Sequence, residues 1–260
     1  MKKIALIALI MIVLFSFSAC KTTVGNMTSK DKIIQGDNHT IFKISEEKEV
    51  YAQDSDTLLL TVKFSYPEIE NKKNSKTIEK VNATLKDFVE QNLWEFEEDY
   101  LASAKDEYVY SKANKVDFIS YFTGVDYEIF YDKKDILSLV FTVERYAGGA
   151  HPNYTKTAFN FDMLTGEKLK LSDVLDMTEQ KANKMISETF YTVVFEEKDL
   201  YFDEALEYIS SDKFRPEFYI TEDSIQFFTQ LYEIAPFAAG FPQIGISFDE
   251  SKSILKDRFK

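Results

Sequence analysis

Two strand patterns joined by a short glycine-rich loop constrain the fold of this 260-residue chain more than any other feature. The strands are expected at residues 136–145 and 154–162, and the loop between them contains Gly148, Gly149 and Pro152. Adjacent glycines permit positive φ angles and a close approach of the backbone, while proline lacks an N–H donor. We therefore predict an antiparallel meander whose loop is the first place to look for a special site.

The first twenty residues have the pattern of an export signal that ends in a lipidated cysteine. Lys2 and Lys3 precede an apolar run at residues 4–17, which is short for a membrane span. The sequence Phe-Ser-Ala-Cys that ends at Cys20, the only cysteine, resembles a bacterial lipobox, in which the cysteine sulfur carries a diacylglyceryl group. We predict a signal peptide at residues 1–19, lipidation of Cys20 and an extracytoplasmic, membrane-anchored lipoprotein. An ordinary signal peptide with a chance cysteine is the alternative.

The chain is acidic, with a formal net charge of -13. Loss of a signal peptide with two lysines and no acidic residue would change this charge to -15. Such a charge argues against nucleic acid or anionic lipid as the general partner and favours attraction to cationic proteins. An acidic surface can also serve solubility alone. Hydrophobic residues make up 45% of the chain and aromatic residues 15%, which is ample for a core with β-rich packing.

The patterns along the chain predict an α+β fold in which antiparallel sheets are packed by helices, in two modules. A flexible tether is expected at residues 20–40, and His39 should be solvated there. A small strand–helix–strand module follows at residues 41–132, and a larger module of meander and helices at residues 133–260.

Apolar periodicity and turn residues assign the elements within these modules. Pro67 should close the second strand, and Gly124 should mark a bulge. Asp176 and Glu179 have the spacing of a capping box before a helix whose apolar stripe includes Ile186 and Phe190. The first module should contain strands at residues 41–52, 57–66 and 116–131 and a helix at 76–104. The second should end with a short helix at 203–210, a hairpin at 218–229, an irregular apolar corner at 232–241, a strand at 243–248 and a helix at 250–258.

Two longer stretches resemble a known family. The run RYAGGAHPNYTKTAFNFDMLTGEKLKLSDVL, followed downstream by YEIAPFAAGFPQIGISF, resembles the extracytoplasmic domain of RsiV-type anti-sigma factors. The same pair of modules precedes the catalytic part of PdaC-type peptidoglycan deacetylases. The resemblance covers residues 41–250 and implies an α/β fold in two parts. In RsiV-type proteins this domain is a receptor that binds lysozyme, and in the deacetylases it is a noncatalytic accessory.

Departures from this family limit what the resemblance implies. We expect no cytoplasmic region for a sigma factor, no membrane span and no metal motif of a polysaccharide deacetylase, so neither activity carries over. What carries over is recognition of a lysozyme-like cationic protein or of cell-wall glycan. The contact residues should lie where family motifs and irregular backbone coincide, at Tyr146, Gly148, Gly149, His151, Asn153, Tyr154 and Tyr232.

The residues themselves leave three classes of function open. The chain has no nucleophile-elbow, zinc-protease, phosphate-loop or dinucleotide motif. His151, the only histidine outside the tether, is expected to order its loop rather than to act as a base. We therefore predict a non-enzymatic binding module without cofactor or metal. The alternatives are a glycan-binding accessory protein, a cell-wall hydrolase, which needs only two carboxylates, and a structural envelope lipoprotein without a ligand.

Overall fold

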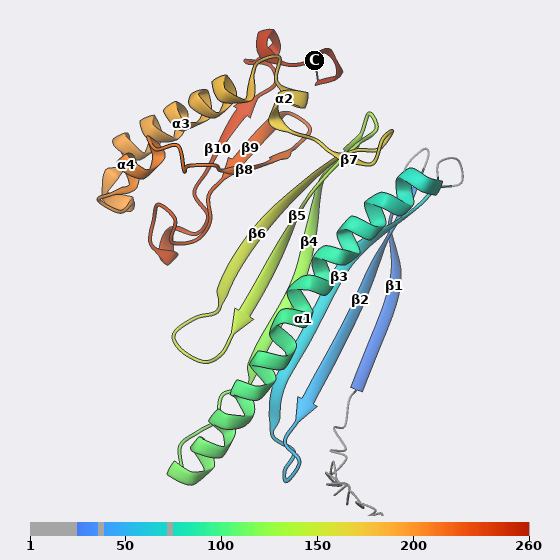
Figure 1. Ribbon diagram of the computed structural model, residues 1–260, viewed down its shortest axis with the longest axis vertical. Helices are drawn as coiled ribbons and strands as arrows, with labels where there is room; N and C mark the ends of the chain where they lie inside the picture. Colours follow the sequence, from blue (N-terminus) through green and yellow to red (C-terminus); the bar gives the residue numbers. More distant parts are fainter. Residues whose placement is uncertain (1–24, 36–38, 72–74, 260) are drawn as a thin grey trace, which may run out of the picture.

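The computed structural model describes residues 25–35, 39–71 and 75–259, so the predicted signal peptide and Cys20 lie outside the described residues. The described chain forms an α+β fold with one large sheet, one long helix and a smaller C-terminal unit (Figure 1). The predicted fold class is confirmed. Among the helices of these residues, none is long and apolar enough to cross a membrane.

The large sheet contains seven strands whose order in space follows their order in the sequence. Neighbouring strands run antiparallel except β3 and β4, which pair in parallel. Parallel neighbours need a crossover connection, and helix α1 supplies it. The strands are β1 (Gly25–Gln35), β2 (Thr40–Tyr51), β3 (Leu58–Glu70), β4 (Tyr121–Lys133), β5 (Ile136–Tyr146), β6 (Asn153–Asp162) and β7 (Glu167–Lys168).

Helix α1 (Ser75–Asn114) lies along one face of the sheet (Figure 1). It continues beyond its predicted end at Ala104, where its last turns are tied to the turn between β2 and β3. There the hydroxyl of Tyr108 donates a hydrogen bond to the carboxylate of Asp54 at 3.0 Å. The buried side chains of the helix follow the predicted stripe and include Ile78, Val81, Leu85, Val89 and Leu93.

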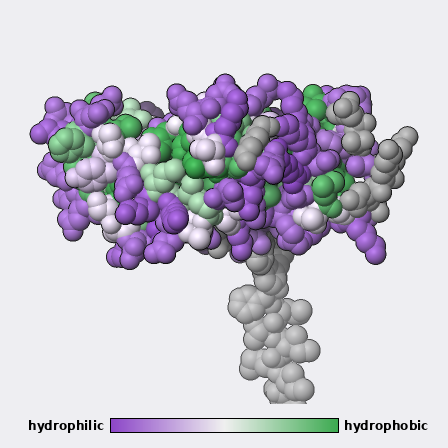
Figure 2. Space-filling view, turned by 90° about the horizontal axis from the view of Figure 1, so that it is seen from above, coloured by the Kyte–Doolittle hydropathy of each residue, from purple (hydrophilic) through white to green (hydrophobic). Residues whose placement is uncertain are grey.

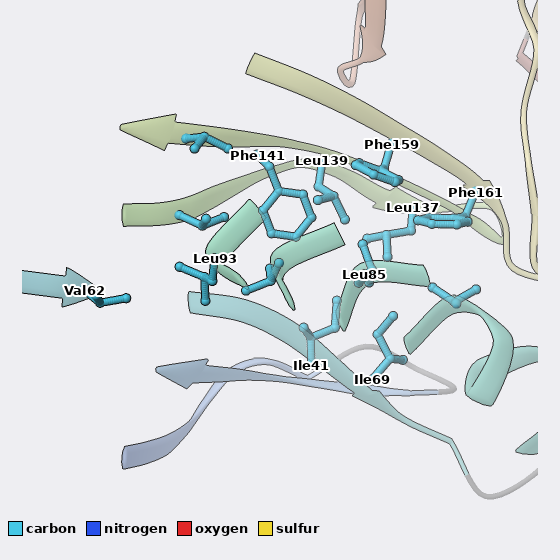
Figure 3. Close-up of a cluster of buried hydrophobic side chains, with 14 of the residues drawn as sticks. Ile41, Val62, Ile69, Leu85, Leu93, Leu137, Leu139, Phe141, Phe159 and Phe161 are labelled. Atoms are coloured by element: carbon cyan, nitrogen blue, oxygen red, sulfur yellow. The ribbon is translucent and has the colours of Figure 1, made fainter. Parts of the chain in front are cut away.

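The first apolar core fills the space between α1 and the sheet (Figure 3). The ring centroids of Phe141 on β5 and Phe159 on β6 lie 4.8 and 5.2 Å from that of Phe88 on the helix. Leu85 of the helix and Leu137 of β5 belong to the same core. Burial of one large apolar side chain stabilises the fold by about 1.5–3 kcal/mol. The many buried side chains between α1 and the sheet are therefore the main source of stability for the first part of the chain.

The C-terminal unit has a three-stranded antiparallel sheet, the 18-residue helix α3 and several short helices around a second apolar core. At its centre the ring of Phe190 meets the ring of Phe214 edge to face, with centroids 5.2 Å apart. Phe190 and Ile186 are buried, as predicted. The elements are α2 (Leu171–Val174), α3 (Glu179–Glu196), η1 (Lys198–Leu200), α4 (Ala205–Ile209), β8 (Glu217–Ile220), β9 (Ser224–Phe228), η2 (Phe237–Ala239), β10 (Gln243–Ser247), η3 (Lys252–Ile254) and η4 (Asp257–Phe259).

The C-terminal unit packs on the sheet face opposite α1, at one end of that face. Ile136 belongs to the second core while its neighbour Leu137 belongs to the first, because successive strand residues point to opposite faces. The hydroxyl of buried Ser138 donates to the amide oxygen of Asn160 at 2.7 Å and accepts the N–H of Ile220 at 2.8 Å. Seen along the long axis from this end, the surface is mostly hydrophilic (Figure 2).

The observed division of the apolar cores differs from the boundary expected between residues 132 and 133. That position lies in the turn between β4 and β5, which pair along their length in one sheet. Apart from Ile136 and the partly buried Tyr131, the chain passes from the first core to the second between Met163 and Leu169. Turn residues locate a hairpin, but they do not show which strands share a core.

Several local predictions are wrong. Residues 25–35 are not a tether but form β1, because a polar sequence suits an exposed edge strand as well as a coil. Pro67 does not close β3; it lies beyond the last pair of β3 with β4, where its missing N–H breaks no bond between these strands. The irregularity in β4 lies between Ile129 and Tyr131 and not at Gly124.

Three further corrections concern the ends of elements. His39 is not solvated, because its Nε2 lies 3.0 Å from a carboxylate oxygen of Asp132, and this hydrogen bond raises the pKa of His39. Helix α3 begins after Thr178, whose side chain accepts the cap hydrogen bond, so Asp176 is not the N-cap. The helix predicted at residues 250–258 is instead a pair of single 3-10 turns, η3 and η4.

Candidate functional site

The β5–β6 loop is shaped by its two glycines and by two hydrogen bonds. Gly148 and Gly149 have φ angles of 80° and 104°, which residues with a side chain rarely adopt. The hydroxyl of Tyr146 donates to the carbonyl of Gly149 at 3.0 Å. The Nδ1 of His151 lies 2.8 Å from the carbonyl of Pro152, which can only accept, so this nitrogen carries the proton. In the neutral ring Nε2 is then an acceptor.

This loop meets the apolar corner at residues 232–241, which follows β9. The hydroxyl of Tyr232 donates to Nε2 of His151 at 3.1 Å. The ring of Phe237 stacks on the imidazole, with centroids 3.6 Å apart and an angle of 14° between the planes. Tyr232 has a φ of 62°, an uncommon value for a residue other than glycine, and its exposed fraction is 49%. We call His151, Tyr232 and Phe237 the aromatic cluster.

Hydrogen bonds along one edge of β6 bring these two segments together. Gln230 bridges to the backbone of Lys156: its Oε1 accepts the N–H at 3.0 Å, and its Nε2 donates to the carbonyl at 2.8 Å. Glu217 accepts the N–H of Ala158 at 2.7 Å. The side chains of Gln230 and Glu217 thus form hydrogen bonds with backbone groups of β6 that would otherwise be unpaired at the edge of the sheet. They also hold the chain just before Tyr232 against β6, which sets the corner beside the loop.

Three charged residues whose pKa values are shifted by burial lie on β6 and on its neighbours β7 and β8. Burial raises the pKa of Glu217 and lowers the pKa values of Lys156 and Lys168. The ammonium of Lys156 lies 4.5 Å from the ring centroid of Phe241, and that of Lys168 lies 4.0 Å from the centroid of Phe159. Aromatic rings therefore stabilise two cations where water is partly excluded.

The part of the sheet face opposite α1 that the C-terminal unit leaves uncovered carries a groove of about 190 Å³, which we call the sheet groove. It lies over Gly124, where a Cβ atom would be only 2.8 Å from the ring of Phe122. This close approach of the ring to the backbone explains why glycine occupies the position. The charged residues that line the groove are Lys43, Lys63, Asp126 and Glu144.

Hydrogen bonds hold both carboxylates of the sheet groove. Burial opposes ionisation of Asp126, but bonds from Ser65, from the backbone N–H of the next residue and from Lys43 outweigh it and lower the pKa of Asp126. A general acid needs a raised pKa, so Asp126 does not suit that role. Glu144 accepts from the hydroxyl of Tyr154 at 3.2 Å, so Tyr154 faces this groove rather than the aromatic cluster.

The structure thus brings together some of the predicted contact residues. His151 and Tyr232 meet in the aromatic cluster, and Tyr146 braces the loop. Asn153 is exposed at the start of β6. Phe237 is a member of the cluster that the sequence does not single out; its place after a proline in an apolar corner is a signal, but only the fold pairs it with His151. Among the described residues, no group of three or more histidine, cysteine, aspartate and glutamate side chains could hold a metal ion.

Two family models match the chain. Residues 52–154 match the model described as deacetylase PdaC, and residues 172–249 match a protein family of unknown function, DUF3298. A curated relative, the peptidoglycan-N-acetylmuramic acid deacetylase PdaC of Bacillus subtilis strain 168, is 28% identical over 198 residues. The match covers 75% of this chain and 39% of the relative. The predicted similarity to PdaC-type deacetylases is confirmed, while that to RsiV-type proteins stays a prediction.

Two solved structures share the fold. A DUF3298 family protein from Bacteroides fragilis superposes with a TM-score of 0.59 at 20% identity, over 91% of this chain and 95% of that one. A DUF3298 family protein from Pseudomonas aeruginosa PAO1 superposes with a TM-score of 0.51 at 12% identity, over 92% of this chain and 96% of that one. At these identities the likeness shows the fold alone.

Proposed function

We propose that this protein is a non-enzymatic recognition module of the cell envelope and that its aromatic cluster contacts a cationic, lysozyme-like protein. The observation that carries the proposal is the meeting of the glycine-rich loop and the apolar corner in one exposed group of rings. Aromatic side chains of this kind are frequent anchors of protein interfaces. The net charge, -13 for the whole chain and -15 without the two lysines of the predicted signal peptide, would raise the rate of encounter with a cationic partner.

Contacts within the protein hold the rings of the aromatic cluster in place. The ring of His151 is held by the carbonyl of Pro152, by the hydroxyl of Tyr232 and by stacking on Phe237. Ordering a side chain on binding costs about 0.5–1.5 kcal/mol, and a side chain that is already held avoids much of this cost. Rigidity therefore supports a binding role as well as a role in shaping the loop.

Calorimetry of residues 21–260 with lysozyme, at low and at physiological salt, tests the proposal. We expect binding that weakens as salt rises, because charge attraction is screened. Tyr232→Ala and Phe237→Ala should each weaken binding about tenfold, which corresponds to about 1.4 kcal/mol. Tyr191→Ala, which removes an exposed ring on α3, is the matched control and should change nothing.

The absence of heat and of a complex at about tens of micromolar would reject lysozyme as the partner. Binding that survives His151→Ala and Tyr232→Ala unchanged would keep the partner but remove the aromatic cluster as its site.

A second candidate function is binding of peptidoglycan glycan. It is favoured by the similarity to a deacetylase that is named for peptidoglycan and by the ring of Phe122 beside the carboxylates of the sheet groove. Sedimentation with insoluble peptidoglycan tests it, and Phe122→Ala should then leave the protein in the supernatant. Turnover of labelled peptidoglycan that is lost in Glu144→Gln would instead make the protein a hydrolase.

The location at a membrane depends on Cys20. Cys20→Ser should release the protein from membranes or leave an uncut precursor, because the serine hydroxyl does not accept the lipid. Cell fractionation with detection of the precursor is the measurement. Normal processing together with unchanged membrane retention would contradict lipid anchoring.

A further inference from the structure

We infer that the end of the molecule formed by the last turns of α1 and the segment leading to β4 rests on the lipid bilayer and orients the domain there. Four large apolar side chains are exposed at this end, with exposed fractions of 65% for Val109, 59% for Tyr110, 54% for Val116 and 51% for Ile119. We call these four residues the apolar tip. The inference depends on the anchor at Cys20 proposed above.

Strand β1 begins at the same end of the molecule as the apolar tip. Gly25 pairs with Glu49, two residues before β2 ends. The turn that follows β2 is tied to the last turns of α1, because Tyr108 and Lys112 both donate hydrogen bonds to Asp54. The start of β1, the β2–β3 turn and the apolar tip therefore share one end, the lower end in Figure 1.

The chain between the lipid and this end is short. Five residue steps separate Cys20 from Gly25, and an extended chain spans at most about 3.6 Å per residue, so the connection reaches about 18 Å at most. Helix α1 has 40 residues and is about 60 Å long at about 1.5 Å per residue. A lipid on Cys20 therefore keeps the lower end of the domain within reach of the bilayer, whichever way the domain tilts.

Charge favours contact of this segment with a membrane over contact of other parts of the domain. Residues 105–119 contain three lysines and three acidic residues, whereas the whole chain carries a net charge of -13. The neighbouring β2–β3 turn adds Asp56 and Asp54, and Asp54 accepts a hydrogen bond from Lys112. An anionic membrane repels an acidic domain, but it does not repel this balanced segment. Tyrosine and aliphatic side chains gain by leaving water at the bilayer interface. Of the surfaces at this end, the apolar tip is thus the one whose contact with the bilayer has the lowest free energy.

Met27 near the start of β1 is 77% exposed and also lies toward this end, whereas the exposed rings of the C-terminal unit do not. Tyr191 and Phe195 stack on each other on α3 of the C-terminal unit, at the far end of α1 from the tip (Figure 1). Phe195 is 60% exposed, close to the value for Tyr110, which makes it a matched control. A domain that stands on its tip directs the C-terminal unit, which lies at the upper end in Figure 1, away from the lipid.

Hydrogen exchange on vesicles tests the inference. Because Cys20 is the only cysteine, purified residues 20–260 can be coupled through its sulfur to maleimide-bearing lipid in phosphatidylcholine vesicles, whether or not a cell lipidates it. On coupling, amide exchange at residues 105–120 should slow several-fold, while exchange at residues 186–196 should not change. The double variant Val116→Asp, Ile119→Asp should lose this protection, and Phe195→Asp should keep it.

Unchanged exchange at residues 105–120, or equal slowing over the whole domain, would overturn the inference. Slowing that depends on protein concentration without vesicles would assign the tip to a second copy of the chain and would also overturn it. Thermal melting checks that the double variant folds, and Tyr110→Ser takes its place if it does not. The tip variants should bind lysozyme in solution like the wild type. The experiments therefore distinguish a failure of the proposed lysozyme binding from a failure of the proposed membrane contact.

Discussion

The two faces of the large sheet are covered in different ways. One face is covered by α1 along its length, and Leu137, Leu139 and Phe141 of β5 point to it. The other face is covered by the C-terminal unit only at one end, where Ser138 lies, and it is open at the other end, where Thr142 lies. One strand thus borders a continuous core on one side and passes from a packed region to an exposed groove on the other.

This difference shows how the sheet combines stability with an exposed surface. Polar groups in the covered half are buried and therefore need partners inside the protein, which Ser138 and Asn160 find in each other and in β8. In the open half, Lys63 and Glu144 face the sheet groove. The β5–β6 hairpin is therefore held by α1 on one face and by the C-terminal unit at one end of the other face. The rest of that second face, which carries the sheet groove, is available for recognition.

The strongest test of the comparison removes one ring from each core. Phe141→Ala in the first core and Phe190→Ala in the second should each cost about 3–5 kcal/mol, because both rings are fully buried. Since hydrogen bonds join the two units across the sheet, we expect calorimetry to show a single transition that shifts in both variants. Two separate transitions, only one of which moves, would mean that the cores unfold independently.

A smaller effect separates the covered half of β5 from its open half. Ser138→Ala should destabilise the protein by about 1–3 kcal/mol, because it leaves the N–H of Ile220 buried without an acceptor. Thr142→Ala, on the same face of the same strand but in the open groove, should stay within about 0.5 kcal/mol of wild type. Urea unfolding of both variants measures the difference, and equal costs would show that the two halves are alike.

The smallest effect concerns the ion pair that ties the start of β2 to the end of β4. The hydrogen bond to Asp132 raises the pKa of His39 in the folded protein. Its stabilisation is therefore fully present below the unfolded pKa of about 6.5 and is lost as the pH rises through the folded pKa. His39→Gln should lower the free energy of unfolding more at acidic than at alkaline pH, by at most about 1 kcal/mol, which thermal melting at the two pH values measures. An equal loss at both pH values would exclude the charged pair.

The predicted elements and buried residues agree best with the structure where a regular helix or strand faces an apolar core. The hairpin of β5 and β6, the stripe on α1 and the burial of Phe190 all follow from local periodicity, because a pattern of period 2 or 3.6 needs only neighbouring residues to be read. Prediction from local patterns fails for β1, whose polar residues form an edge strand only because β2 is there to pair with it. It also fails for His39, because its hydrogen-bond partner Asp132 lies 93 positions away in the sequence and no local pattern indicates the contact.

Local patterns along the chain are enough to predict the fold class, the meander and the acidic charge, and they single out the glycine-rich loop and the apolar corner. Folding in three dimensions is needed before these two segments meet, before Phe237 stacks on His151 and before the start of β1 comes to the same end as the apolar tip. The two kinds of information differ in their range along the chain. Propensity and periodicity act over a few residues, whereas the hydrogen bonds of Gln230 and Glu217 along β6 join positions that become neighbours only after the sheet has formed.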